Sequence, residues 1–282
     1  MGCILTADSG STKTHWILTD EKNGTLEVAT AGINPVRDTQ SAIFLLLQHD
    51  LLTQLPTDNI SEIHFYGAGC IHPYSESVRA ALHSTFPEAR ISVNSDLLGA
   101  ARALLRNEPG IACILGTGSN CGRYDGHQIA ESVPALGYIL GDEGSGAVLG
   151  RTLVGSLYKG LLGDELRSQF EAEYRTSQAD IIERVYRGAQ PNTFLASLTP
   201  FLAHHRSEPA IHDLLCDAFR QFARRNLARF SPQYTTANFV GSIAHVFQPE
   251  LSEALCAEGL QLGRVLRNPA PEIARFHAAT RH

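Results

Sequence analysis

The chain has 282 residues, of which 43% are hydrophobic, and its 23 basic and 29 acidic residues leave a net charge of −6. This length predicts roughly two domains with substantial cores. The acidic balance, with no long run of Lys or Arg, argues against nucleic acid as a partner. The sequence contains no apolar run long enough to span a membrane and no export signal, so we expect a cytoplasmic protein with no membrane partner.

Alternating strands and helices are predicted over the first 110 or so residues. The apolar periodicity predicts strands over 2–7, 14–19, 27–31, 62–66 and 90–93, and helices over 39–52, 74–85 and 97–105. The first two strands form a hairpin around a polar, Gly-containing turn at 8–12. The turn residues Asn107-Glu108-Pro109-Gly110 mark the predicted boundary between a domain over 1–109 and a second one over 110–265.

The opening pattern recurs at this boundary. Residues 110–115 form an apolar strand, 116–120 a Gly-rich turn, and 121–124 a returning strand. A repeated strand–turn–strand unit indicates a duplicated α/β domain with a cleft between the copies. The pattern then predicts mostly helix over 146–229, a late strand and turn over 239–243, and two short helices over 257–265 and 273–279.

The two Gly-rich turns are candidate phosphate sites, because glycine allows an anion to approach backbone N–H groups and hydroxyls closely. Asp8 ends the first strand, where its carboxylate could hold Mg²⁺ through water, and Lys13 could meet phosphate charge. Plain hairpin turns are the alternative. The sequence has neither GxxxxGK[ST] nor a full dinucleotide fingerprint, so a P-loop and a Rossmann nucleotide site are excluded.

Two carboxylate-bearing segments lie at predicted helix starts. Asp96 follows a short strand and opens a helix, whose N-terminus favours its ionised form. There it could take the proton of a sugar hydroxyl that attacks a γ-phosphate, or it could be an N-cap. The carboxylates of the segment 141–146, with three glycines in six residues, could bind sugar hydroxyls, or the segment could be a cap.

The cysteines and histidines predict no metal site. The six cysteines form no CxxC pair and no regular spacing, so the sequence predicts neither a zinc site nor a disulfide framework, and a reducing compartment fits. The neighbours His204 and His205 diverge on a helix and cannot share an ion. Cys70, Cys113 and Cys121 are expected to be buried small residues.

These motifs, in order, resemble the BadF/BadG/BcrA/BcrD ATPase family, and most closely its N-acetylglucosamine kinases. The matching segments are Asp8-Ser9-Gly10-Ser11-Thr12-Lys13, Asn94-Ser95-Asp96, Gly116-Thr117-Gly118-Ser119-Asn120, Gly137 with Gly141-Asp142-Glu143-Gly144-Ser145, and Val240-Gly241-Ser242. The resemblance implies an α/β fold of two ribonuclease-H-like domains of the actin and hexokinase type, with a nucleotide and sugar cleft between them. It also implies that residues 266–282 return to the first domain.

The resemblance also implies roles for single residues. It makes Asp96 the catalytic base and a sugar contact, and Asp8 the magnesium residue. ATP would be bound by Gly10, Ser11, Thr12, Lys13, Thr117, Gly241 and Ser242, and the sugar by Asn34, Ser119, Asn120, Gly137 and Asp142. Leu136 replaces a tryptophan that animal relatives carry beside the sugar, which leaves the acceptor open.

The function implied is transfer of the γ-phosphate of ATP, with Mg²⁺, to the 6-hydroxyl of N-acetylglucosamine or a related N-acetylhexosamine. The small amino sugar is the expected partner, and a homodimer is common among relatives. An ATPase that activates or senses, without a sugar acceptor, is the main alternative. Activator branches of the family carry an iron–sulfur cluster, but their paired cysteines are not evident here. A non-catalytic sugar-binding regulator is the third possibility.

Overall fold

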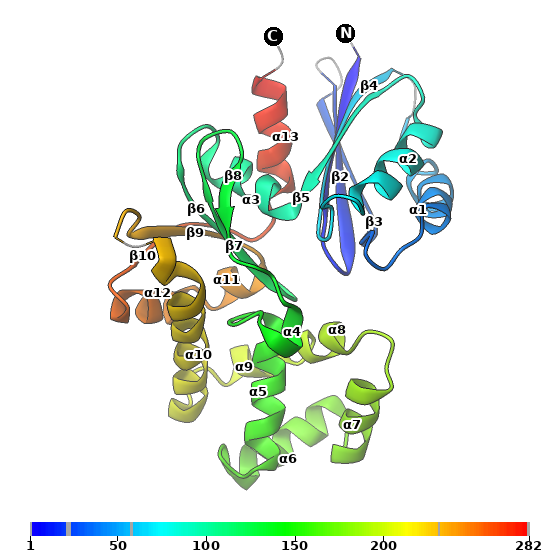
Figure 1. Cartoon of the computed structure of the whole chain (residues 1–282). Coiled ribbons are helices and arrows are strands. Elements are labelled where there is room, and N and C mark those ends of the chain that lie inside the picture. Colours follow the sequence, from blue (N-terminus) through cyan, green and yellow to red (C-terminus); the bar gives the residue numbers. More distant parts are fainter. Residues whose placement is uncertain (1, 21–23, 57–58, 231, 281–282) are drawn as a thin grey trace. The chain divides into compact units, whose positions relative to one another are not determined.

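The chain folds into two units, each built around one five-stranded sheet (Figure 1). The computed structural model describes residues 2–20, 24–56, 59–230 and 232–280. Unit 1 comprises Met1–Pro109, Tyr124–Ala130 and Asn268–His282, and unit 2 comprises Gly110–Arg123 and Glu131–Arg267.

The sheet of unit 1 has the order β3-β2-β1-β4-β5. Its strands are β1 (Cys3–Ser9), β2 (Lys13–Asp20), β3 (Gly24–Ala31), β4 (Ile60–Gly67) and β5 (Arg90–Ser95). The first three strands pair antiparallel, whereas β1, β4 and β5 run parallel. The carboxyl ends of three parallel strands therefore meet at one edge of this sheet, where open α/β sheets bind ligands.

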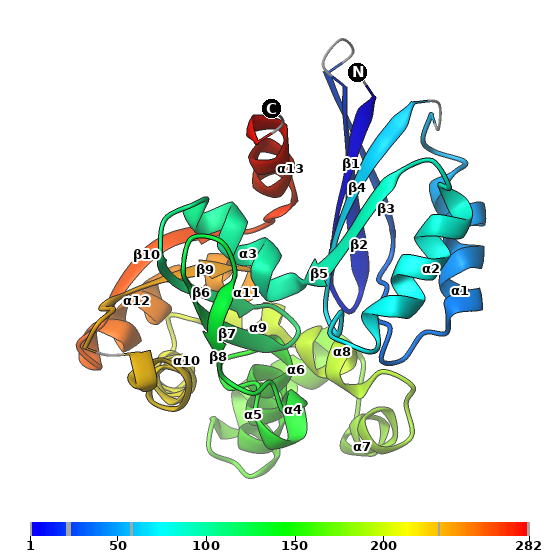
Figure 2. The same ribbon diagram turned by 45° about the horizontal axis from the view of Figure 1, so that its top comes forward.

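Helices cover both faces of this sheet (Figure 2). One face carries α1 (Gln40–Leu46), which continues into a π-helical turn (Leu47–Leu51), and α2 (Ser75–Thr85). The other carries α3 (Asp96–Leu105) and α13 (Ala270–Ala279), which pack against each other. The core includes the fully buried Trp16, Leu47 and Phe65. The predicted elements of this unit are confirmed, with shifts at their ends.

The sheet of unit 2 repeats the strand order of unit 1. Its order is β10-β9-β6-β7-β8, with β6, β9 and β10 parallel. The strands are β6 (Gly110–Leu115), β7 (Ser119–Tyr124), β8 (Ile129–Ser132), β9 (Thr236–Val240) and β10 (Gln261–Leu266). In both units the first strand of a hairpin pairs with a later parallel strand, so the predicted duplication is confirmed.

The helices of unit 2 lie mostly between β8 and β9. They are α4 (Gly137–Leu140), α5 (Gly146–Tyr158), α6 (Gly163–Tyr174), α7 (Gln178–Tyr186), α8 (Pro191–Ala196), α9 (Thr199–His204) and α10 (Pro209–Phe222), followed by a π-helical turn (Ala223–Leu227) and a 3-10 turn (Ala228–Phe230). Two more, α11 (Ser242–Val246) and α12 (Gln248–Ala257), precede β10. Phe201, Phe219 and Phe239 are among the fully buried residues of the core.

The helix predicted over 257–265 is wrong. Helix α12 ends at Ala257, and Gly259 at φ 73° takes the left-handed conformation that commonly ends helices. The chain then forms β10, which begins where the Gln261 N–H donates to the Thr235 carbonyl at 2.7 Å and pairs parallel to β9. This long-range pairing, with Leu262 and Val265 packed on the core, overrides the local apolar spacing. The helix predicted over 273–279 is confirmed as part of α13.

Among the described residues, no helix combines the length and the apolar character that a membrane-spanning segment requires.

Candidate active site

The turn between β1 and β2 exposes the side chains predicted to meet phosphate. It is closed by a hydrogen bond of 3.0 Å from the Gly10 N–H to the Lys13 carbonyl. Thr12 and Lys13 are exposed and Ser11 is partly exposed. Ser9 is instead buried, and its hydroxyl lies 2.7 Å from that of Thr14 and donates to a backbone carbonyl. The hydroxyl of Ser9 therefore anchors the turn, while the next residues remain available to a ligand.

The backbone of Gly32 packs directly against this turn. Its N–H donates to the Thr12 carbonyl at 3.1 Å. A Cβ atom at this position would lie 2.3 Å from the carbonyl oxygen of Gly10, so only glycine lets the chain leaving β3 come this close. This packing role depends on a contact between residues about 20 positions apart, so no local sequence pattern could predict it.

Asp8 and Asp96 lie at the carboxyl edge of the unit 1 sheet. Asp8 pairs with Tyr66 of β4, and Tyr66 pairs with Asn94 of β5, two residues before Asp96. Asp96 is the first residue of α3, and its Oδ1 accepts a hydrogen bond of 2.8 Å from the Leu97 N–H. The N-cap is Ser95, whose hydroxyl accepts from the Leu98 N–H at 3.3 Å. The alternative of Asp96 as an N-cap is therefore wrong.

Both carboxyl groups are held at raised pKa values. Burial, and then the charge of Asp96, raise the pKa of Asp8 to about 7. Burial raises the pKa of Asp96 to about 6, against the lowering effect of backbone N–H donors at Leu97 and Asp96 itself. The helix N-terminus thus favours the ionised form of Asp96 less strongly than burial opposes it. Neither carboxylate has an Arg or Lys partner among the described residues.

Asn34 follows β3 in a tight loop of unit 1. Its Oδ1 accepts a hydrogen bond of 3.0 Å from the Val36 N–H, and its backbone N–H donates to Asp38 at 2.8 Å. Within the part of the chain that the structure describes, its side-chain Nδ2 has no hydrogen-bond partner. The loop therefore fixes the side-chain oxygen and leaves both N–H groups of Nδ2 for a ligand.

In unit 2, the turn between β6 and β7 is hydrogen-bonded to the start of α5. The Gly116 N–H donates to the Gly118 carbonyl at 3.0 Å, which closes the turn. At the start of α5, the N–H groups of Gly146 and Ala147 donate to the Gly116 and Thr117 carbonyls, at 2.8 and 3.1 Å. Free N–H groups at a helix start need partners, and here the turn supplies them.

Two predicted sugar contacts lie together beside this turn. Asp142 has φ 56°, and its carboxylate accepts a hydrogen bond from the Ser119 N–H. Burial raises the pKa of Asp142, and that hydrogen bond opposes the shift. The N-cap of α5 is Ser145. The alternative of a helix cap therefore explains Ser145 but not the carboxylates of the segment 141–146.

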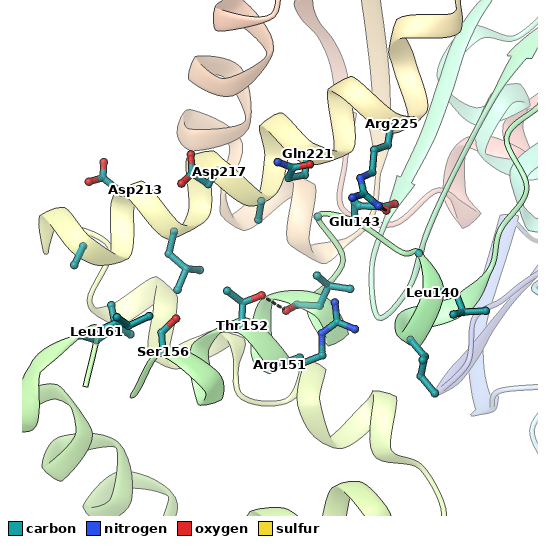
Figure 3. Close-up of a pocket in the computed structure, with 18 residues that line it drawn as sticks. Leu140, Glu143, Arg151, Thr152, Ser156, Leu161, Asp213, Asp217, Gln221 and Arg225 are labelled. Atoms are coloured by element: carbon teal, nitrogen blue, oxygen red, sulfur yellow. Dashed lines mark hydrogen bonds and ion pairs between the residues drawn. The ribbon is translucent and has the colours of Figure 1, made fainter. Parts of the chain in front are cut away.

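Glu143 is already engaged within unit 2. Its carboxylate accepts from Arg225 at 3.1 Å (Figure 3). It also accepts from the Asn226 side chain at 3.3 Å. The sequence had suggested both carboxylates of this segment as sugar ligands. Because Glu143 is paired with Arg225, Asp142 is the better candidate of the two.

The turn after β9 packs against the end of β6. Gly241 has φ 119°, and a Cβ atom there would lie 2.2 Å from the Leu115 carbonyl oxygen. Its N–H donates to the Leu266 carbonyl at 2.9 Å, and the exposed Ser242 then begins α11. Unit 2 therefore brings three predicted segments together: the turn after β6, the Asp142 loop and the Gly241 turn.

The remaining predicted sugar contacts lie on β7 and at the start of α4. Asn120 follows Ser119 on β7 and is partly exposed. Gly137 is the first residue of α4, at φ 75°, and is exposed. Leu136, the departure from the animal relatives, is 59% exposed and can reach a ligand only as an aliphatic surface.

A cavity of about 710 Å³ lies between α4, α5 and α10 (Figure 3). Leu140, Thr152 and Asp217 are among the residues that line it, and the Glu143–Arg225 pair lies at one end. Of the carboxylates that the sequence suggested as sugar ligands, Glu143 lines this cavity and Asp142 does not.

Two sheets of this repeated strand order define the actin-like ATPase fold. Ethanolamine utilization protein EutJ of Carboxydothermus hydrogenoformans shares it, at 15% identity and a TM-score of 0.57 over 96% of this chain and 89% of that one. The putative N-acetylglucosamine kinase of Porphyromonas gingivalis is far more similar. It is 43% identical to this chain over 99% of this chain and 100% of that one, with a TM-score of 0.95.

At that identity and coverage, the chain belongs to the N-acetylglucosamine kinase-like branch of the BadF/BadG/BcrA/BcrD ATPase family, and the family prediction is confirmed. A Chromobacterium violaceum protein described in the same words is 19% identical over 98% of this chain and 99% of that one, with a TM-score of 0.71. A scan of family models gives no match, and neither does a search of curated proteins.

Proposed function

We propose that this chain is an ATP-dependent sugar kinase that phosphorylates the 6-hydroxyl of N-acetylglucosamine or a related N-acetylhexosamine. The 43% identity to the Porphyromonas gingivalis protein supports the substrate class. The observation that carries the reaction type is the pair of carboxylates at the carboxyl edge of the unit 1 sheet, which have raised pKa values and no cationic partner among the described residues.

Asp96 is the proposed general base. With a pKa of about 6, it is mostly ionised at neutral pH, and it is basic enough to take a proton efficiently. Its carboxylate accepts the proton of the attacking hydroxyl while that oxygen bonds to the γ-phosphorus. The bond from the γ-phosphorus to the bridging oxygen breaks, and ADP leaves.

The residues around Asp8 fit a magnesium ion. The charge of Asp96 raises the pKa of Asp8, and a divalent cation would stabilise the ionised form of Asp8 because Mg²⁺ prefers carboxylate and water oxygens. Asp8 would hold the ion through water. Bound Mg²⁺ would neutralise phosphate charge and orient the phosphates.

The other assignments follow the positions of the donors. We assign Ser11, Thr12 and Lys13, and the second turn at Thr117, to the phosphates of ATP. Gly10 keeps the first turn short, and Gly241 and Ser242 are assigned to the adenosine. For the sugar we assign the Nδ2 of Asn34 and the group at Ser119, Asn120, Gly137 and Asp142.

A coupled ADP-release assay over a panel of sugars tests the proposal. The panel contains N-acetylglucosamine, N-acetylmannosamine, N-acetylmuramic acid, glucosamine and glucose. We expect one N-acetylhexosamine to stimulate ADP release strongly, with a phosphosugar of the expected mass in the product. ATP hydrolysis at the same rate with and without every sugar would overturn the proposal in favour of an activator or sensor ATPase.

A 6-deoxy analogue of the best sugar tests the position of transfer. It should bind and compete with the sugar but should not be phosphorylated. Phosphorylation of the analogue would assign the reaction to another hydroxyl.

A further inference from the structure

Three side chains of different chemistry converge on two packed helices of unit 2. His212 and Cys216 lie on α10, and Glu253 lies on α12. One ligand atom from each lies within 4.8 Å of the other two. We propose that His212, Cys216 and Glu253 form a Zn²⁺ site that joins α10 to α12. None of these residues has a part in the proposed kinase reaction.

The local geometry suits a small tetrahedral ion. His212 and Cys216 are four residues apart, so they lie one above the other on the same face of α10. The Nε2 of His212 is 3.2 Å from the Oε2 of Glu253 and 3.8 Å from the Sγ of Cys216. With Zn–S near 2.3 Å and Zn–N and Zn–O near 2.1 Å, tetrahedral angles separate nitrogen from oxygen by about 3.4 Å and nitrogen from sulfur by about 3.6 Å. Both distances from the His212 nitrogen lie close to these tetrahedral values.

The ligand types select zinc over the common hard cations. A thiolate and an imidazole favour Zn²⁺, whereas Mg²⁺ and Ca²⁺ prefer sites made of oxygen atoms. The side chains of His212 and Glu253 are 37% and 56% exposed, while Cys216 is buried. An ion can therefore enter from solvent, and water can complete its coordination.

The surroundings support a bound cation. The Nδ1 of His212 lies 4.0 Å from the carboxylate of Asp213, which adds negative charge beside the site. The Cys216 thiol must lose its proton to bind a metal. Zinc would displace the thiol proton, so binding should release about one proton. Without an ion, His212 lies beside the Glu253 and Asp213 carboxylates. The Cys216 thiol makes weak contacts with His212 and with the Glu250 carbonyl.

Metal titrations of the full-length, metal-stripped chain test the site. Zn²⁺ is titrated against a chromophoric chelator, and Co²⁺ serves as a spectroscopic substitute. We expect one tight equivalent of Zn²⁺ and, with Co²⁺, an ultraviolet charge-transfer band that reports a sulfur ligand. Calorimetry in buffers of different ionisation enthalpy should show the proton release.

The ligands have a matched control. His212→Gln and Glu253→Gln should each weaken Zn²⁺ binding by more than about 100-fold, because even an outer partner of a metal ligand contributes 10–100-fold. Cys216→Ala should also abolish the cobalt–sulfur band. Cys256→Ala, which removes the exposed cysteine of α12, should change neither the Zn²⁺ affinity nor the cobalt–sulfur band.

Two results would overturn the proposal. One is a wild-type chain that fails to compete with the chelator for Zn²⁺. The other is unchanged Zn²⁺ affinity in the folded His212→Gln and Glu253→Gln variants. Both positions are partly exposed, so these variants should keep the native circular dichroism spectrum even if Cys216→Ala does not. The readouts do not depend on kinase activity, so failure of one proposal leaves the other intact.

Discussion

The two Gly-rich turns have the same place in their sheets but different supports. In unit 1, the turn after β1 is supported by the backbone of Gly32, and it exposes Thr12 and Lys13. In unit 2, the turn after β6 is held by the first N–H groups of α5 and is packed against Gly241. The first turn exposes side chains to a ligand. The backbone of the second turn is instead fixed on two sides, by the start of α5 and by Gly241.

The carboxylates differ in the same way. In unit 1, the charge of Asp96 raises the pKa of Asp8, and neither carboxylate has an Arg or Lys partner among the described residues. In unit 2, Asp142 accepts the Ser119 N–H. The two units thus share the strand order of their sheets but differ in the surroundings of their carboxylates. We expect loss of the Asp96 carboxylate in unit 1 to change the chemical step and loss of the Asp142 carboxylate in unit 2 to change binding.

The largest expected effect comes from comparing Asp96→Asn with Asp142→Asn. Loss of the base should lower kcat by about 10²–10⁴-fold while nucleotide binding is kept. Asp142→Asn should mainly raise KM for the sugar, by about 10-fold, because one charged hydrogen bond is weakened. Steady-state kinetics and equilibrium nucleotide binding measure both. Equal losses of kcat in the two variants would remove the proposed division between the units.

The second comparison adds a methyl group behind each turn. Gly32→Ala places Cβ 2.3 Å from Gly10, and Gly241→Ala places it 2.2 Å from Leu115. We expect Gly32→Ala to destabilise the chain by about 1–3 kcal/mol and Gly241→Ala by about 1 kcal/mol more, since alanine is also strained at φ 119°. Both should raise KM for ATP. Urea unfolding and ATP kinetics give the two readouts.

Gly155→Ala is the control for this pair. Gly155 lies within α5 and has open space where a Cβ atom would stand. Alanine there should stabilise the chain by up to about 1 kcal/mol through its better helix propensity, with unchanged kinetics. If Gly32→Ala or Gly241→Ala proved as harmless as this control, the turns would not depend on close backbone contact.

The sequence predicted what is decided locally. The repeated strand–turn–strand pattern located both hairpins, and the position of Asp96 after a strand located it at the sheet edge. The sequence wrongly predicted a helix over 257–265, because pairing with β9 makes most of this segment the strand β10. It could not assign Glu143, because Arg225 and Asn226 are distant in the chain.

The zinc proposal shows the same limit. The spacing of His212 and Cys216 by four residues was visible in the sequence, but one pair of ligands is too weak a signal to predict a metal site. Glu253 joins them only because α10 packs against α12. Contacts between segments far apart in sequence therefore account for what was missed.

The smallest expected effect is a pH dependence of stability. The folded-state pKa values of Asp8 and Asp96, about 7 and about 6, lie above the ordinary value of 3.8. Between pH 4 and 7 the native state therefore binds more protons than the unfolded state, so these groups lower the free energy of unfolding as pH rises. His277 acts in the opposite sense, because burial lowers its pKa to about 3 and its contribution is lost as pH falls below 6.5.

Asp8→Asn separates these opposing contributions, because it leaves His277 in place. Relative to the wild type, the variant should gain stability from pH 5 to pH 8, by about 1–2 kcal/mol, measured by urea unfolding without divalent cations. Asp142→Asn in unit 2 should show a smaller change, because the Ser119 N–H stabilises the ionised form of Asp142. Adding Mg²⁺ should reduce the advantage of Asp8→Asn at pH 8, since a cation bound at the ionised pair stabilises the wild type. Parallel pH profiles for the wild type and Asp8→Asn would mean that the two unit 1 carboxylates do not strain the folded state, and the proposed magnesium site would lose its main support.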